Sequence, residues 1–185
     1  MIIIYGGAFN PPTKAHQTIK AYLINKYNPN WFIFLPVGMK YPKPGLIPYQ
    51  HRENMLKLIA EEPNCVISDF EQTNAFNGTI SALDYFSNLY QERPTFVLGA
   101  DNLKEIETWV EKDRLIETYQ FIVIDRDHEA SRTLKTLNLP ESKFRIESLD
   151  LKQKSSLFRH NQNKYAKDLD EKVLAYIQKH HLYEV

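Results

Sequence analysis

The chain has 185 residues, a length that suits one domain with a substantial buried core. Hydrophobic residues make up 43% of it, and 23 basic residues balance 23 acidic ones, which excludes a disordered chain and a surface charged to attract nucleic acid or an anionic membrane. No apolar run reaches transmembrane length, the first residues lack signal-peptide features, and the single cysteine excludes a disulfide framework. We therefore expect one cytoplasmic domain over residues 1–185, with no nucleic-acid or membrane partner.

Short apolar runs alternate with amphipathic segments along the chain. The strand candidates are residues 2–5, 31–37, 64–68, 95–99 and 120–124, with a weaker one at 144–149. Most are near-continuous apolar runs, which are typical of parallel strands covered on both faces. This alternation predicts an α/β fold, a doubly wound parallel sheet of order 3-2-1-4-5 with helices on both faces. A proline-rich loop at 36–48 is a candidate functional segment, and the apolar spacing within 165–181 predicts a terminal helix.

The first motif follows the first strand and runs Gly-Gly-Ala-Phe-Asn-Pro-Pro-Thr-Lys-Ala-His from Gly6 to His16. Two glycines after a strand allow a tight turn and let backbone N–H groups approach an anion, and the helix that follows adds partial positive charge. Thr13 and His16 are three residues apart, so on a first helical turn both can donate hydrogen bonds to phosphate. The spacing matches neither G-x-G-x-x-G nor the P-loop, so the motif predicts a phosphate site of another kind.

The second motif, Gly99-Ala100-Asp101, ends the fourth strand candidate. In a sheet of the expected order, strands one and four flank the switch point at which ligands bind. Asp101 can accept hydrogen bonds from a ribose there, or it can cap the next helix. By residue type alone, Trp109 suits the core and Arg126 suits a solvated surface, so neither is assigned to a site on composition.

The third motif is Lys-Ser-Ser-Leu-Phe-Arg, from Lys154 to Arg159. Hydroxyl groups at the start of a helix and an arginine about one turn later can bind the β- and γ-phosphates of a nucleotide. Taken alone, the same pattern also describes a helix cap followed by a surface arginine.

These motifs carry a resemblance. The first resembles the signature G-x-F-[DN]-P-x-[HT]-x-G-H of the nucleotidyltransferase superfamily, with Thr13 and His16 in its two polar positions. The third resembles that superfamily's S-T-x-x-R. The segment from Gly99 to Trp109 and the ending Leu-Tyr at Tyr183 are similar to the nicotinate mononucleotide adenylyltransferase family. The resemblance spans nearly the whole chain and implies a Rossmann-like single nucleotidyltransferase domain with a C-terminal helical segment.

That family resemblance implies transfer of an adenylyl group from ATP to nicotinate mononucleotide, which yields deamido-NAD and pyrophosphate. It also implies Mg²⁺ brought with ATP, no separate protein metal site, and catalytic roles for His16, Thr13 and Arg159. The residues implied to bind ATP are Gly6, Gly7, Ala8, Phe9, His16, Gly99, Asp101, Arg126, Ser155, Ser156 and Arg159. Those implied to bind the pyridine mononucleotide are Asn10, Lys43, Thr79, Asp101 and Trp109.

Two alternatives stay open at the level of sequence. A related enzyme that acts on nicotinamide mononucleotide or phosphopantetheine keeps the first motif and changes the acceptor region around Lys43 and Thr79. A non-catalytic nucleotide-binding relative keeps the fold and releases no pyrophosphate. The sequence also leaves a homo-oligomer open, because 11 tyrosines and 10 phenylalanines suit an interface as well as a core.

Overall fold

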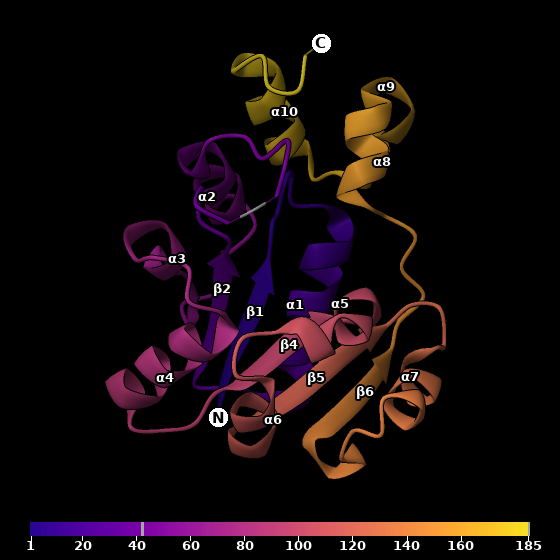
Figure 1. The fold of residues 1–185 in the computed structure, drawn as a ribbon. Coiled ribbons are helices and arrows are strands. Elements are labelled where there is room, and N and C mark those ends of the chain that lie inside the picture. The colour runs from indigo at the N-terminus through magenta and orange to yellow at the C-terminus, as the bar shows by residue number, and fades with distance from the viewer. Residues whose placement is uncertain (42, 185) are drawn as a thin grey trace.

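A six-stranded parallel sheet forms the centre of the computed structural model, which describes residues 1–41 and 43–184 (Figure 1). The strands are β1 (Ile2–Gly7), β2 (Trp31–Pro36), β3 (Cys65–Ile67), β4 (Thr95–Gly99), β5 (Gln120–Asp125) and β6 (Phe144–Ser148). Their order is β3-β2-β1-β4-β5-β6, and every neighbouring pair is parallel. The predicted doubly wound order is confirmed, and the weaker strand candidate extends it as a sixth strand beside β5.

Helices cover both faces of the sheet. One face carries α1 (Lys14–Tyr27), α2 (Tyr49–Lys57), α8 (Ser155–His160) and α10 (Glu171–Lys179). The other carries α4 (Thr79–Tyr90), α5 (Ala100–Lys104), α6 (Lys112–Thr118) and α7 (Ala130–Thr136). The remaining short elements are α3 (Phe70–Thr73), α9 (Gln162–Tyr165) and the 3₁₀ turns Ile106–Thr108, Glu141–Lys143 and Ala166–Asp168. None of the helices within the described ranges combines the length and apolar character that a membrane crossing requires.

Strand β1 shows why the strands are apolar throughout. Ile2 and Ile4 pack into the cluster that contains Leu83 of α4, whereas Ile3 packs into the cluster that contains Leu23 of α1. All five side chains are at most 1% exposed. Because successive side chains point to opposite faces, a strand with helices on both sides needs apolar residues at every position.

The topology opens a crevice at the carboxyl end of β1. This strand pairs with β2 on one side and with β4 on the other. The connections to its two neighbours lie on opposite faces, so the loops diverge at this end of the sheet and leave room for a ligand. Figure 1 shows α2, α8, α9 and α10 gathered beyond the carboxyl ends of β1 and β2.

The prediction of one terminal helix over 165–181 is wrong in its extent. Leu169 has an extended backbone, and its side chain is 1% exposed in the cluster with α1 and α2, so the chain bends there. Asp170 then caps a new helix by accepting a hydrogen bond from the Lys172 backbone N–H at 2.9 Å, and α10 ends at Lys179. Burial of one side chain therefore interrupts a pattern that is helical by spacing alone.

Candidate active site

Two cavities adjoin at the carboxyl ends of β1 and β4. The first, here called the aromatic cavity, has a volume of about 260 Å³ and is lined by Tyr41, Phe76, Phe96 and Trp109 among others. The second, the polar cavity, has a volume of about 290 Å³. Its lining includes His16, Asp101, Arg126, Ser155, Ser156 and Arg159. Both linings contain Gly6, Gly7, Ala8, Lys43 and Asn102, so groups bound in the two cavities meet at the end of β1.

The two glycines of the first motif complete β1 rather than form the expected tight turn. A Cβ on Gly6 would lie 2.6 Å from the Phe96 ring, so glycine lets this side chain of β4 pack against the strand without displacement. The chain turns at Phe9, whose φ is 47° and whose ring is 2% exposed. The glycines therefore keep the backbone bare at the boundary of the two cavities, and the turn comes after them.

His16 is held by the residue that caps its helix. Its Nδ1 accepts a hydrogen bond from the Thr13 backbone N–H at 2.8 Å, and the Thr13 hydroxyl lies 3.0 Å from the same nitrogen. Since Nδ1 is an acceptor, the ring proton sits on Nε2. Burial, together with the Arg126 charge, lowers the pKa of His16 to about 3, so the imidazole is a neutral donor.

Thr13 itself lies beneath this histidine. Its side chain is 1% exposed, and it is absent from the lining of the polar cavity, whereas His16 is half-buried and part of that lining. The structure thus places Thr13 where it orients His16, and not where its own hydroxyl reaches a ligand.

Helix α8 forms the far wall of the polar cavity. The Ser155 hydroxyl donates to the Pro11 carbonyl at 2.8 Å, and Arg159 donates to the Asn10 carbonyl at 2.5 Å. These two bonds tie the third motif to the first across more than 140 residues of sequence. Arg126, after β5, donates to the Gln153 carbonyl at 2.9 Å and brings a further positive side chain to the lining.

Among the residues implied to bind the mononucleotide, Asn10 lies apart from Thr79 and Trp109 but shares the polar cavity with Lys43 and Asp101. It is 3% exposed and contributes to the polar cavity, not the aromatic one. Its Nδ2 donates to the Gly45 carbonyl at 2.8 Å, and its Oδ1 accepts from the Tyr183 hydroxyl at 2.9 Å. Its side chain therefore holds the 43–47 loop and the C-terminal segment together.

Two more residues of the second motif reach the polar cavity. Gly99 ends β4, and a Cβ there would meet no atom within 4 Å, so space alone does not require glycine. Asp101, in α5, is exposed. It lines the polar cavity but not the aromatic one, although the resemblance implies contacts with both nucleotides. Within the described ranges, no group of three histidine, cysteine or acidic side chains is placed to hold a metal ion.

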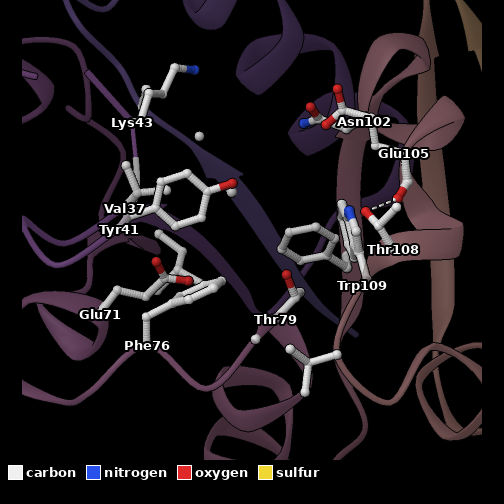
Figure 2. Close-up of a pocket in the computed structure, with 17 residues that line it drawn as sticks. Val37, Tyr41, Lys43, Glu71, Phe76, Thr79, Asn102, Glu105, Thr108 and Trp109 are labelled. Atoms are coloured by element: carbon white, nitrogen blue, oxygen red, sulfur yellow. Dashed lines mark hydrogen bonds between the residues drawn. The ribbon is translucent and has the colours of Figure 1, made fainter. Parts of the chain in front are cut away.

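The aromatic cavity lies between two aromatic walls (Figure 2). Trp109 packs edge-to-face against Phe96, with ring centroids 6.1 Å apart, and Tyr41 packs edge-to-face against Phe76 at 4.9 Å. Thr79, the first residue of α4, lies between these walls. Trp109 is half-buried and lines the cavity, so its ring serves the site as well as the core.

The sequence motifs missed several residues of this cavity. Tyr41 comes from the proline-rich loop, for which the sequence predicts a functional segment but no particular residue, and Phe76 lies in a loop whose pattern carries no signal. Glu71, which matches the family's sequence pattern but has no role assigned by it, is 8% exposed and lines the same cavity. Burial raises the pKa of its carboxyl group to about 7.

The chain is similar in sequence to proteins of a known family. The model of the Cytidylyltransferase-like family matches residues 4–169. A protein of Acholeplasma laidlawii, named "Probable nicotinate-nucleotide adenylyltransferase", is 35% identical over an alignment of 188 residues that covers 100% of this chain and 98% of the relative. A protein of the same name from Caldicellulosiruptor bescii is 33% identical over 77% of this chain and 74% of its own length.

Solved structures agree with these sequence matches. The nicotinic acid mononucleotide adenylyltransferase of Plasmodium falciparum, complexed with NaAD, superposes with a TM-score of 0.84 at 25% identity, covering 98% of this chain and 96% of that one. The chain belongs to the cytidylyltransferase-like nucleotidyltransferases and, within them, to the nicotinate-nucleotide adenylyltransferase family.

Proposed function

We propose that the chain transfers the adenylyl group of ATP to the 5′-phosphate of nicotinate mononucleotide, releasing pyrophosphate and forming deamido-NAD. The observation that carries this proposal is the meeting of an aromatic cavity and a polar cavity at Gly6–Ala8. A planar pyridine ring suits the first cavity and a triphosphate suits the second, so the two reacting phosphates come together where the backbone is bare. The names of the relatives and the bound NaAD of the Plasmodium structure support this choice of acceptor.

In this proposal the polar cavity takes ATP as its magnesium complex. Mg²⁺ keeps several waters and is held largely by substrate phosphates, so it arrives with the nucleotide and needs no cage of protein ligands. Arg159 and Ser156 hold the leaving pyrophosphate, with Ser155 beside them, and Arg126 lies on the nucleotide side of the cavity. The bare strand ends at Gly6, Gly7 and Gly99, with the Ala8–Phe9 turn, give the nucleotide a close approach.

For this reaction the protein must align the two phosphates and stabilise the negative charge that develops on them. An acceptor phosphate oxygen attacks the α-phosphorus of ATP, a new P–O bond forms, and the bond from the α-phosphorus to the pyrophosphate oxygen breaks. The nucleophile is already anionic at neutral pH, so no side-chain base is needed. His16 donates its Nε2–H to a non-bridging α-phosphate oxygen as negative charge grows there, and Thr13 keeps its ring in that tautomer.

The aromatic cavity takes the acceptor. Trp109 stacks on the pyridine ring, Thr79 donates to the ring's carboxylate, and Lys43, which belongs to both linings, meets the acceptor phosphate. Asn10 acts on the acceptor indirectly, by holding the loop that carries Lys43. The proposal treats residues 1–185 as one nucleotidyltransferase domain that works in the cytoplasm, where ATP is available.

The test is pyrophosphate release from ATP and Mg²⁺ with nicotinate mononucleotide, nicotinamide mononucleotide and phosphopantetheine offered separately. We expect strong preference for the nicotinate form. If pyrophosphate is released only with one of the other two acceptors, the chain still transfers a nucleotidyl group, but the assignment of nicotinate mononucleotide as the acceptor is wrong. Absence of release with all three overturns the activity and favours the non-catalytic alternative.

A further inference from the structure

One oxygen of a buried carboxylate in the aromatic cavity lacks a hydrogen bond. Among the described residues, Oε2 of Glu71 is the buried side-chain oxygen without a hydrogen bond. The carboxylate has the backbone N–H of Gly38 beside it, and Glu71 forms no ion pair within the described ranges. Leaving a buried polar atom unpaired costs free energy, so such atoms in native proteins call for an explanation. A ligand that supplies the missing partner is one such explanation.

The carboxylate faces the place where a flat ring fits. Figure 2 shows Glu71 beside Tyr41 and Phe76, with Thr79 and Trp109 on the other side of the cavity. The backbone around it is tightly packed, because a Cβ on Gly38 would lie 1.9 Å from the Glu71 carbonyl oxygen. The acid is thus fixed by its surroundings and is not a mobile surface side chain.

No charged group nearby forms a hydrogen-bonded ion pair with Glu71 among the described residues, although the charge of Arg52 acts on it from a distance and opposes the rise of its pKa. Arg52 of α2 is fully buried, and its guanidinium donates to the Ile47 carbonyl at 3.1 Å and to the Ala8 carbonyl at 3.0 Å. Lys43 is exposed at the end of the cavity shared with the polar one. Across the cavity the titratable lining group is Glu105, which is exposed and also acidic. Tyr41, the remaining titratable neighbour, is neutral at physiological pH because burial raises its pKa.

We propose that Glu71 is a specificity-determining residue, whose carboxylate provides the counter-charge for the cationic ring of the acceptor. This inference rests on the proposed function and deepens it. A pyridine ring bonded to ribose through nitrogen carries a fixed positive charge, which aromatic faces and a carboxylate both attract. The 1,4-dihydro form of the same ring has nearly the same shape and no charge. The cavity should therefore prefer the oxidised ring to the reduced one.

Titration of Glu71 gives the preference a pH dependence. Its pKa of about 7 means that the ionised fraction rises through neutral pH, so affinity for the cationic ring should increase between pH 6 and pH 8. The bound cation in turn favours the ionised carboxylate, so binding should release protons below pH 7. Affinity for the neutral ring should not change in this way.

The experiment measures dissociation constants by calorimetry for nicotinate mononucleotide and its 1,4-dihydro form, on the wild-type chain and Glu71→Gln. The ring carboxylate and the 5′-phosphate are present in both ligands, so their contributions cancel in the ratio of the two constants. We expect the wild type to prefer the oxidised ring by about fivefold or more at pH 8, as for a partly buried charge pair. Glu71→Gln should lose most of this preference while its KM for ATP stays unchanged.

Two further variants test whether the preference depends on Glu71 or on negative charge near the cavity in general. Glu105→Gln removes the exposed acid across the cavity, and Glu53→Gln removes an acid of α2 outside both linings; both should keep the preference. The inference is overturned if the wild type shows no preference or binds neither ring, if Glu71→Gln keeps the preference, or if Glu105→Gln alone abolishes it. Because binding is measured directly, loss of pyrophosphate release in the separate assay overturns the proposed function without deciding the role of Glu71.

Discussion

At the scale of single residues, the location of one proton decides what His16 can do. The Thr13 backbone N–H occupies Nδ1, so Nε2 carries the proton and faces the polar cavity as a donor. Because the pKa of His16 is lowered to about 3, this donor persists across the physiological range. Donors aimed at developing negative charge in a partly desolvated site contribute strongly to catalysis.

Replacing His16 with alanine should lower kcat by about 10²- to 10³-fold, the typical cost of removing one such donor. The measurement is steady-state pyrophosphate release together with circular dichroism, which should show an intact fold. His160→Ala is the matched control, because His160 is exposed and lines neither cavity. A kcat for His16→Ala within a few-fold of the wild type contradicts the role.

Glu71 should also leave a mark on stability as pH changes. Its pKa is about 7 in the folded chain against 4.5 as the ordinary value, so the unfolded chain loses this proton first as pH rises. The free energy of unfolding therefore falls between pH 4.5 and 7 on account of this group. Glu71→Gln should remove that loss. The unfolding free energy of the variant minus that of the wild type should therefore be up to about 3 kcal/mol larger at pH 8 than at pH 4.5.

Urea denaturation at a series of pH values measures this difference. Glu141→Gln, at an exposed acid, serves as the control and should follow the wild type. An offset between Glu71→Gln and the wild type that is the same at every pH refutes the buried titration.

At the scale of elements, a single carboxylate joins helix α1 to the edge strand β6. Glu147 is 5% exposed and accepts from the hydroxyl groups of Tyr22 and Tyr27 and from Lys26, whose Nζ lies 2.7 Å from Oε2. These partners outweigh the effect of burial and lower the pKa of Glu147, so it stays ionised. Strand β6 is the last strand of the sheet and has β5 as its one neighbour among the described strands. The contact with Glu147 therefore holds this edge strand against α1.

Glu147→Ala should lower the free energy of unfolding by about 1–3 kcal/mol, because it leaves hydrogen-bonding groups around a buried position unpaired. Chemical denaturation measures the loss, and Glu141→Ala provides an exposed comparison. Turnover at 25 °C should not change, since Glu147 lines neither cavity. An unfolding free energy equal to that of the wild type shows that the contact contributes nothing.

At the scale of the whole molecule, the C-terminal segment reaches the loop that follows β1 at the candidate site. The Tyr183 hydroxyl donates to Asn10, and Asn10 holds Gly45, so the C-terminal segment supports the loop that carries Lys43. The backbone carbonyl of Tyr183 accepts from Gln162, and its ring packs edge-to-face against Phe158 of α8. Both cavities therefore depend on residues 173 positions apart.

Tyr183→Phe should raise the KM for the mononucleotide about fivefold, the equivalent of one lost hydrogen bond, and leave kcat nearly unchanged. A merely structural role predicts instead that kcat and both KM values change with stability. Tyr176→Phe is the control, because this tyrosine of α10 contacts His51 and Asn54 of α2, outside the site. Equal effects of the two substitutions argue against positioning of the loop.

Much of the architecture was predictable because burial on both faces leaves a strong local pattern. Runs such as Ile2–Tyr5 must be apolar throughout, and parallel strands need helical crossovers of consistent hand, so a doubly wound parallel sheet follows. For the polar lining, the residue pattern predicted His16 at the end of β1, whereas Arg126 and Arg159 were implied only by the family resemblance. Whether each touches substrate remains a prediction.

The sequence by itself determined the parallel sheet and the phosphate-binding pattern at the end of its first strand, because these depend on local periodicity and chain connectivity. Only the tertiary structure decided that Thr13 lies beneath His16, that Asn10 holds the Gly45 loop, and that α10 starts only after Leu169. It also brought Glu71 into an aromatic cavity, where its Oε2 has no hydrogen bond among the described residues. The physical reason is that hydrogen bonding and desolvation depend on which groups are neighbours in space, and residues distant in sequence supply those neighbours.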